Sequence, residues 1–399
     1  MRTPKVLSLI FANMPAISKW QRRFIITLLT TVFALRGRLT FTNLSRFSPL
    51  HEQTFRRHFE KFFDWIAFNL TVLSLAPSSK TGQIIGALDC TFVAKSGKKT
   101  YGLDRFWSSS LSKAERGLEV SVVALIETQT RQRFALDAAQ TPPNLSQTAD
   151  ESYSRIDFYM EQFSDCVRAL PEVTYFVADG YYAKEKVFSA MTGQDRYLIT
   201  RLRSDANLRY LYQGPRKKGP GAPKRYDGKV RFDDLSRFDY LGGLDDKRHI
   251  DLYSKRLNSP HFKRDFRVVV LVNTRDNSYV VLASTDTGQS AREVVRFYRL
   301  RFQIELLFRD AKQFAGLCHC QARSQEKLDF HFNVSLAAVN VARLEMLLSD
   351  EVISLTSYVR QAYNGWLVGH LLSQLGLRRR FGLNHPQVER VIHMGSIAA

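Results

Sequence analysis

The first 80 residues carry apolar side chains three and four positions apart, with few of the β-branched alternations that are typical of strands. A turn is expected at Ser48-Pro49, because serine and proline interrupt the spacing there. These features predict a small helical domain over residues 1–80.

The pattern changes at residue 84, where β-rich apolar runs replace the helical spacing. The runs predict three adjacent strands, over 84–93, 118–128 and 133–140. Helices and strands are then expected to alternate, over 149–169, 173–179, 183–191 and 197–203. Three strands followed by such an alternation indicate a mixed α/β sheet.

The next part of the chain, residues 204–287, is predicted to be largely β and to be inserted into the sheet domain. A long helix is expected from Ala291 to Phe314, and the pattern after it is helical. The predicted division is therefore a sheet core over 81–203 and 288–345, a β-rich insertion over 204–287, and a helical C-terminal region over 346–399.

Charge adds information about the partner. The 58 Lys plus Arg residues outnumber the 38 Asp plus Glu residues and give a formal net charge of +20. Such a balance favours a polyanionic partner, since binding to phosphates releases their condensed counterions. The chain shows no basic amphipathic anchor, so nucleic acid is favoured over a membrane surface.

Two basic segments are candidates for that contact. Residues 39–63 resemble a helix-turn-helix whose second helix begins with Ser48 as cap and displays Arg57 and Lys61. Any solvated helix carries such residues too, and both interpretations stay open.

The second segment is the Gly- and Pro-rich loop over 214–229. It carries Lys217, Lys218, Lys224 and Arg225, which suit backbone phosphates, although an ordinary solvated loop has the same composition. The segment KSGKKTYGLDRFW at 95–107 is also basic, with interleaved aromatic residues. This composition fits either a DNA contact or the surface of a hairpin.

Cysteine content and hydropathy bear on the compartment. Four cysteines are too few for a disulfide framework and fit a reducing cytoplasm. The longest apolar stretch, residues 24–35, is too short to cross a bilayer as a helix. A cytoplasmic protein without a membrane partner is expected.

Two aspartates follow apolar runs that are predicted to be strands. Asp89 ends the run IIGAL, and Asp179 ends the run VTYFVA. Ligands usually bind at strand ends in α/β sheets, although a carboxylate there also serves as a simple cap. Asp104, Glu119 and Asp137 lie near the first strands and are alternative candidates for a catalytic acid. Their positions fit a cluster at strand ends less well.

The predicted long helix carries a polar stripe. Tyr298, Arg301, Glu305 and Lys312 project within about 60° of one another on an ideal helix. The opposite side offers an apolar seam for packing, formed by Leu300, Ile304, Leu307, Ala311 and Phe314. A surface helix with one Arg–Glu pair, worth roughly 0.3–0.5 kcal/mol, explains the pair but not its association with two strand-end aspartates.

The spacing Y-x2-R-x3-E-x6-K, preceded by Asp89 and by Asp179-Gly180-Tyr181, resembles the DDE transposases of bacterial insertion sequences that carry the YREK motif. The resemblance spans roughly residues 84–345. It implies an RNase H-like core with a β-rich insertion between the second aspartate and the glutamate.

The resemblance also implies roles for residues. Asp89, Asp179 and Glu305 are expected to hold two Mg²⁺ ions, for which Mn²⁺ can substitute. Residues Tyr298 and Arg301, together with Lys312, are expected to contact transposon-end DNA. The implied partners are double-stranded DNA, as terminal inverted repeats and target, and a second copy of the chain in a synaptic complex at the bacterial nucleoid.

Three carboxylates suit this chemistry. Phosphodiester cleavage needs a nucleophile made from water, a stabilised leaving oxygen and neutralised phosphate charge, all of which a pair of metal ions supplies. Mg²⁺ prefers oxygen ligands. The favoured hypothesis is a transposase that cleaves and transfers DNA strands; a catalytically silent DNA-binding relative and a nuclease without joining activity are the alternatives.

Cys318-His319-Cys320, with His331 as a fourth ligand, offers a zinc hypothesis. The spacing is unusual for a structural zinc site and a second cysteine pair is missing. A partly buried turn after the long helix is the favoured interpretation.

Overall fold

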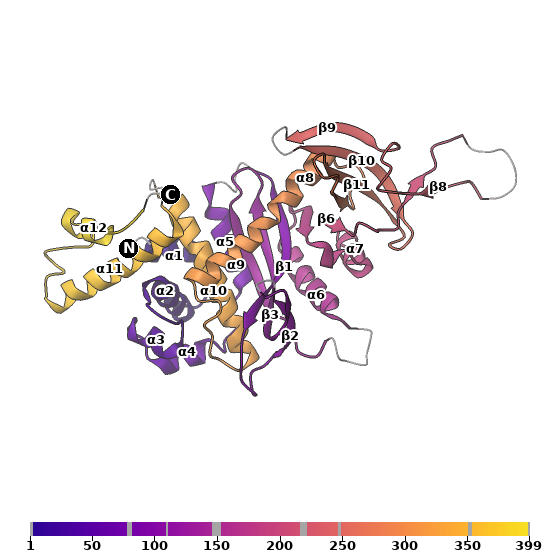
Figure 1. Ribbon diagram of the computed structural model, residues 1–399. Coiled ribbons are helices and arrows are strands. Elements are labelled where there is room, and N and C mark those ends of the chain that lie inside the picture. The colour runs from indigo at the N-terminus through magenta and orange to yellow at the C-terminus, as the bar shows by residue number, and fades with distance from the viewer. Residues whose placement is uncertain are drawn as a thin grey trace. The chain divides into compact units, whose positions relative to one another are not determined.

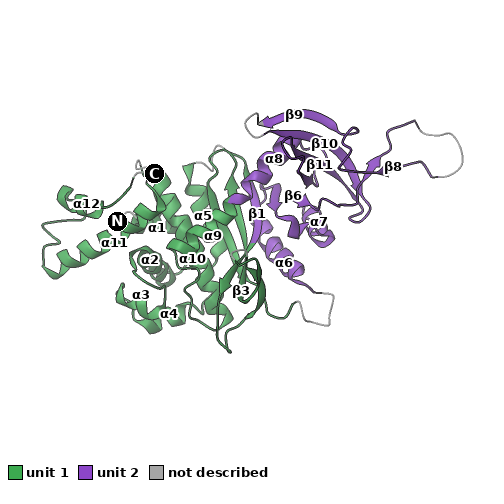
Figure 2. Cartoon of the chain, viewed as in Figure 1, with its two compact units in different colours: residues 1–84, 90–152, 303–399 green, residues 85–89, 153–302 purple. Residues whose placement is uncertain are grey.

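The computed structural model describes residues 3–77, 82–108, 111–145, 153–215, 222–245, 249–349 and 353–397. The chain forms two compact units, coloured separately in Figure 2. Unit 1 comprises Met1–Ile84, Cys90–Ser152 and Gln303–Ala399, and unit 2 comprises Ile85–Asp89 and Tyr153–Phe302. The predicted core, 81–203 and 288–345, therefore contributes to both units.

Unit 1 begins with five helices, as the apolar spacing predicts. They are α1 (Thr3–Ala12), α2 (Lys19–Ala34), α3 (Phe41–Arg46), α4 (Glu52–His58) and α5 (Trp65–Leu75). The start predicted for the second helix of the helix-turn-helix is wrong. Its N-cap is His51, whose Nδ1 accepts the N–H of Gln53, whereas Ser48 closes a turn by accepting the N–H of Leu50.

The sheet of unit 1 contains one strand that the sequence analysis did not anticipate. Its strands are the second half of β1 (Ile84–Ala94), β2 (Asp104–Ser108), β3 (Lys113–Glu127) and β4 (Arg133–Gln140), with β3 pairing with each of the others. The unanticipated strand is β2, which pairs antiparallel with the start of β3. The segment proposed as a hairpin surface at 95–107 thus includes part of a strand.

Among the described residues, the helices that complete unit 1 are α9 (Phe302–Phe314, which enters this unit at Gln303), α10 (Gln325–Leu347), α11 (Leu355–Gln374) and α12 (Pro386–Ile392). Helix α10 satisfies the backbone of β4 with side chains. Asn333 bonds both the N–H and the C=O of Ala138, and Asn340 does the same at Ala135. These amides replace the neighbouring strand that β4 lacks on that side.

Unit 2 holds the remaining strands (Figure 1). They are the first half of β1, β5 (Tyr175–Ala178), β6 (Tyr197–Leu202), β7 (Arg209–Leu211), β8 (Tyr226–Lys229), β9 (Asp239–Asp245), β10 (Ile250–Ser259), β11 (Arg264–Asn273) and β12 (Tyr279–Ser284). The order is β1-β5-β6-β12-β11-β10-β7-β8, with β9 also paired to β10. Strands β1, β5 and β6 are parallel, and the rest are antiparallel. Because β12 pairs with β6, the predicted insertion continues the sheet of this unit.

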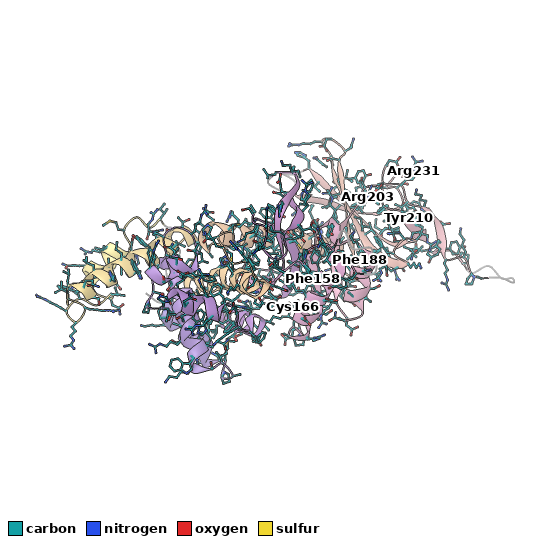
Figure 3. The ribbon with its side chains drawn as sticks, turned by 90° about the horizontal axis from the view of Figure 1, so that it is seen from below. Phe158, Cys166, Phe188, Arg203, Tyr210 and Arg231 are labelled. Carbon is teal, nitrogen blue, oxygen red and sulfur yellow. The ribbon has the colours of Figure 1, made fainter. Side chains whose placement is uncertain are left out.

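Helices of unit 2 bury aromatic side chains. The helices are α6 (Arg155–Arg168), α7 (Glu185–Thr192), α8 (Ala291–Leu300) and the short 3-10 turn η2 (Gly180–Tyr182). Phe188 of α7, labelled in Figure 3, packs edge-on against Phe266 of β11 with ring centroids 5.0 Å apart. Both side chains are fully buried, so this contact fastens α7 to the sheet.

The fold is mixed α/β, as predicted, with a mostly antiparallel set of strands. Among the described helices, none combines the length and the apolar character needed to cross a membrane.

Candidate active site

Asp89 lies within a strand, not at the end of one. Strand β1 continues through Cys90 to Ala94, in agreement with the run predicted over 84–93, so the interpretation that Asp89 terminates the strand is wrong. The polar residue does not stop the strand because the next residues pair with β3. Gly117 of β3 makes this approach close, since a Cβ there would lie 2.5 Å from the ring of Phe92. Asp89 nevertheless marks the point where fully buried positions give way to half-buried ones.

Asp179 follows β5 directly, as predicted. Its Oδ1 accepts the N–H of Tyr181 at 2.9 Å, and its carbonyl accepts the hydroxyl of Thr200 at 2.7 Å. Gly180 lets β6 approach, because a Cβ at this position would lie 3.2 Å from the carbonyl oxygen of Arg201. Asp179 is thus both a cap and a carboxylate in a fixed position.

The two aspartates occupy the same level on neighbouring strands. Strands β1 and β5 are parallel, with Leu88 opposite Ala178, so the next residue on each is an aspartate. Neighbouring strands lie about 4.8 Å apart, and residues in register on parallel strands project from the same face. Both side chains are half-buried. Unit 2 therefore presents a pair of carboxylates that remains accessible to a ligand.

Two stripe residues accompany this pair in unit 2. The guanidinium of Arg301 lies 3.6 Å from Oδ2 of Asp89. Burial raises the pKa of Tyr298, and Asp179 raises it further, whereas Arg301 and Arg201 lower it. The phenol therefore stays protonated at neutral pH and remains a hydrogen-bond donor.

Arg201 is a residue of this site that the sequence analysis missed. It lies on β6, within YLITRL, where it is exposed between the buried residues Thr200 and Leu202. Its charge reaches Tyr298. The signal available in the sequence was a single arginine in an apolar strand, the strand that follows Asp179.

Glu305 and Lys312 belong to unit 1. The predicted single helix from Ala291 to Phe314 is divided into α8 and α9, which are separated by Arg301. The division is slight, because Arg301 keeps helical angles of φ −49° and ψ −37°.

Helix α9 has the two faces that were predicted for this part of the helix. Ile304, Leu307 and Ala311 are fully buried, although Phe314 at the end of the seam is only half-buried. Glu305 and Lys312 are half-buried. Burial lowers the pKa of Lys312, and the nearby Cys318 opposes this effect.

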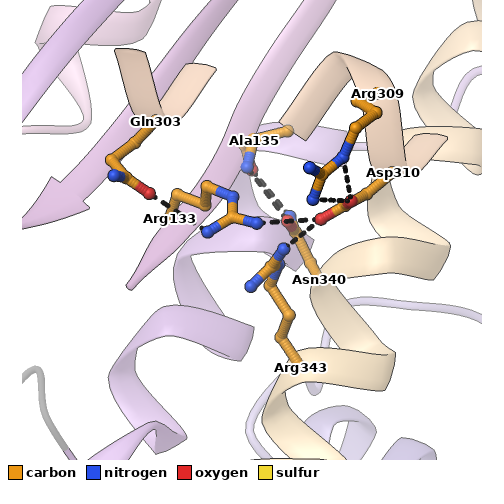
Figure 4. Close-up of polar contacts among 7 residues, drawn as sticks. All are labelled: Arg133, Ala135, Gln303, Arg309, Asp310, Asn340 and Arg343. Atoms are coloured by element: carbon orange, nitrogen blue, oxygen red, sulfur yellow. Dashed lines mark hydrogen bonds and ion pairs between the residues drawn. The ribbon is translucent and has the colours of Figure 1, made fainter. Parts of the chain in front are cut away.

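A buried charge cluster holds α9 in unit 1 (Figure 4). Asp310 accepts from Arg133 of β4 at 2.9 Å, from Arg309 at 3.1 Å, and from Arg343 of α10. Arg133 also donates to the side chain of Gln303 at 3.1 Å. Because Asp310 and Gln303 flank Glu305 on the same helix, the cluster fixes how α9 is turned about its axis in this unit.

Two family models match this chain. The model of the DDE superfamily endonucleases matches residues 15–241, more than half of the chain, and the model of the transposase DDE domain matches residues 159–341. The chain belongs to the DDE superfamily of endonucleases. No curated protein matches it significantly.

Family membership makes this chain a transposase and a nuclease-type enzyme. The mixed α/β architecture is consistent with the RNase H-like fold of DDE transposases, as the resemblance implied. DDE enzymes generally use divalent metals. Asp89 and Asp179 lie within the first matched range, and Asp179 and Glu305 lie within the second.

The other predicted DNA contacts of this DDE enzyme are on the surface where they are described. Arg57, in the last turn of α4, and Lys61, after it, are exposed. In unit 2, Arg225 is exposed and Lys224 pairs with Asp227 at 2.6 Å. Lys217 and Lys218 lie outside the described residues.

The proposed zinc ligands of the DDE enzyme make contacts within the fold. Nε2 of His331 lies 2.9 Å from the carbonyl oxygen of Gly316, and Nδ1 of His319 accepts the N–H of Leu39 at 3.2 Å. The carbonyl of Cys320 accepts from Lys95. Within the described ranges, no three His, Cys, Asp or Glu side chains gather closely enough to hold a metal ion. This finding covers the three predicted catalytic acids as well as the proposed zinc ligands.

Proposed function

We propose that this chain is the transposase of an insertion sequence of the YREK group, which binds the element's ends and cleaves and joins DNA strands with Asp89, Asp179 and Glu305. The observation that carries the proposal is the register of β1 and β5, which puts two half-buried aspartates side by side. Family membership supports the reaction class.

The residues fit a divalent metal. Carboxylate oxygens are the ligands that Mg²⁺ and Mn²⁺ accept most readily, and the side chain of Asp89 keeps 19% of its surface exposed. The guanidinium of Arg301 contacts it at 3.6 Å. In the proposal, Asp89 and Asp179 hold the ions together with Glu305, and a bound pair of ions supplies charge neutralisation and an activated water.

The protein's own side chains position the DNA. Arg301 neutralises Asp89 in the metal-free protein and clamps a phosphate when DNA and metal arrive. Tyr298 donates a hydrogen bond to the DNA end, since its hydroxyl is held protonated. Lys312 contributes a point charge, while Tyr181 and Thr200 fix Asp179 through its carboxylate and carbonyl.

The partners follow from the same proposal. The substrate is double-stranded DNA, first at the terminal inverted repeats and then at the target. An element has two ends, so a homodimer holds both in a synaptic complex. A freed 3′-hydroxyl then takes the place of water and attacks a second phosphate, so that the same acids serve cleavage and joining.

Cleavage of supercoiled DNA that bears the element's ends tests the proposal. The wild type and Asp89→Asn are compared in Mg²⁺, and Asp205→Asn is the matched control because Asp205 is exposed and pairs only locally with Arg203. Asp89→Asn is expected to bind the ends but not to cut, and the control to cut normally. Equal cleavage by Asp89→Asn would reject the assignment.

The two alternatives appear as separate outcomes. A wild-type protein that binds the ends without cutting is a silent DNA-binding relative. A protein that cuts, but does not join a pre-cut 3′-hydroxyl end to a target, is a nuclease without transfer activity. The first outcome contradicts the proposed cleavage, and the second contradicts the proposed joining.

A further inference from the structure

A basic cavity of about 500 Å³ lies in unit 1 where β1 ends. One wall is the segment that follows β1, with Lys95, Ser96 and Thr100, and the opposite wall is the segment 318–323, with Arg323. Arg38 completes its cationic lining, and no Asp or Glu is among the described residues that line it. An acid-free cavity with three cations is suited to an anion.

The cations of the basic cavity are not compensated by acids. Arg38, Lys95 and Arg323 form no ion pair with any Asp or Glu in the described part of the chain. Lys95 donates to the carbonyl of Cys320, which leaves further donors on its ammonium group. Other basic residues of the chain do have acidic neighbours, such as Asp205 beside Arg203.

Titration of neighbouring groups agrees with this positive potential. Burial lowers the pKa of Lys95, the nearby Cys320 raises it, and the charge of Arg323 lowers it again. The pKa of His319, which also lines the cavity, is lowered by burial, by His331 and by the charge of Arg38. A bound anion would reverse these charge effects.

A second cavity, of about 530 Å³, extends the acid-free surface. It shares Cys320, Gln321 and Arg323 with the basic cavity and also has no acid among its described lining residues. Its own cations, Arg56 and Lys327, pair with glutamates outside the lining. The segment 320–323 is therefore a wall that the two cavities share, with Arg323 as a cation common to both.

We propose that the basic cavity binds the phosphodiester backbone of duplex DNA, with Arg38, Lys95 and Arg323 as sequence-independent phosphate contacts. The proposal rests on the proposed function for the presence of a DNA substrate, but it assigns a surface that the acids do not include. A polymer is favoured over a small anion because the acid-free surface continues into the second cavity and because exposed Lys98 and Lys99 follow Lys95.

This assignment also gives the Cys318-His319-Cys320 motif a role. The motif lines the basic cavity, and its backbone anchors Lys95 through the carbonyl of Cys320. Its side chains need not hold a metal for the segment to be required. It forms the turn that brings Arg323 opposite Lys95.

Binding of a fluorescent duplex carrying an element end, measured by anisotropy in EDTA, tests the proposal. Gln321→Glu places an acid of equal size at an exposed position that lines both cavities, with Gln129→Glu on the β3–β4 turn as control. The double change Arg38→Gln with Arg323→Gln removes two cations. A pair of changes at exposed arginines elsewhere, Arg168→Gln with Arg203→Gln, removes the same charge as its control.

The acid variant is expected to bind about fivefold more weakly and the double variant about tenfold, and the controls are expected to bind like the wild type. Loss of two phosphate contacts should make the plot of log Kd against log salt shallower by about two. Equal Kd and equal slope for variants and controls would overturn the proposal, as would displacement of the duplex by millimolar inorganic phosphate.

Cleavage in Mg²⁺ separates the two proposals. A wild type that binds and cuts, with variants that bind normally, contradicts only the basic cavity. A wild type that neither binds nor cuts element ends contradicts the proposed function and the cavity together. Preference of the wild type for single strands over the duplex would also overturn the cavity's assignment.

Discussion

Two aspartates of this chain have arginine neighbours but differ in how completely they are enclosed. Asp310, in unit 1, keeps 5% of its side-chain surface and is contacted by three arginines. Asp89, in unit 2, keeps 19% and has Arg301 at 3.6 Å. The first carboxylate is committed to the fold. The second is held beside another carboxylate at an accessible position, which is what a metal ligand requires.

The comparison shows that an acidic residue's surroundings indicate its role better than its proximity to a positive charge does. Around Asp310 the arginines outnumber the acid, and burial and the charge of Arg133 lower the pKa of Arg343 to about 10. Removing the acid would leave buried cations without compensation. Around Asp89 and Asp179 the arginines do not outnumber the acids, and both carboxylates stay half-buried, where a metal ion can reach them.

The largest effect is expected on activity from Asp179→Asn. Loss of one member of a cooperating catalytic set lowers the cleavage rate by about 10⁴-fold. The amide keeps the acceptor oxygen for Tyr181, so the urea midpoint should change little. Single-turnover cleavage of DNA that bears the element's ends measures the cleavage rate. If the rate fell because the variant unfolds, the contrast between Asp179 and Asp310 would be lost.

The opposite pattern is expected from Asp310→Asn. Three arginines lose their shared acid, two of them well buried, so the free energy of unfolding should fall by about 3–5 kcal/mol. Urea unfolding followed by circular dichroism gives this value. Full stability combined with lost cleavage would place Asp310 in the chemistry and overturn the comparison.

A smaller, pH-dependent effect is expected from Asp329→Asn. Burial raises the pKa of Asp329 to about 7, while its side chain accepts the N–H of Gln140. Between pH 4 and pH 7 the unfolded chain ionises this group first, so the wild type loses stability as pH rises through that window.

An asparagine at this position keeps the acceptor and does not titrate. The variant should therefore be more stable than the wild type at pH 8, by about 2 kcal/mol, and should lose that advantage towards pH 4. Urea midpoints across the range test this. A constant difference between the two proteins at all pH values would show that folding does not raise the pKa of Asp329.

The smallest effect is expected from Asp205→Asn. This acid is 66% exposed in its pair with Arg203, where solvent screens the interaction. Neither the cleavage rate nor the urea midpoint should change measurably. A clear loss in either would show that exposed pairs matter here as much as enclosed ones.

The sequence predicted much of this architecture because periodicity reports burial. The helical N-terminal region, the strands from β10 to β12 and the polar and apolar faces of α9 all follow from spacing. Strand β2 was not predicted, because its five residues, DRFWS, have too few apolar positions to show the alternation of a strand. The start of α4 was misplaced because both Ser48 and His51 can cap.

The site was predicted only in part because tertiary pairing decides it. Asp89 was expected at a strand end, yet β1 runs on, since β3 supplies a partner for the residues after it. Arg201 was overlooked because its relation to Tyr298 depends on how β6 packs beside β5. The hydrogen bonds from the asparagine amides of α10 to β4 could not be predicted, because asparagines in a helix do not indicate which strand they will contact.

The most direct test of the central claim locates the metal without relying on activity. Fe²⁺ replaces Mg²⁺ in the wild-type protein bound to element ends, and hydrogen peroxide with ascorbate is added. The hydroxyl radicals formed where Fe²⁺ reduces the peroxide then cut the peptide chain beside the ion. Cuts are predicted next to Asp89, Asp179 and Glu305, and Asp179→Asn should abolish all three sets together. Cuts that spare Glu305, or that gather at Cys318-His319-Cys320 instead, would contradict the assignment.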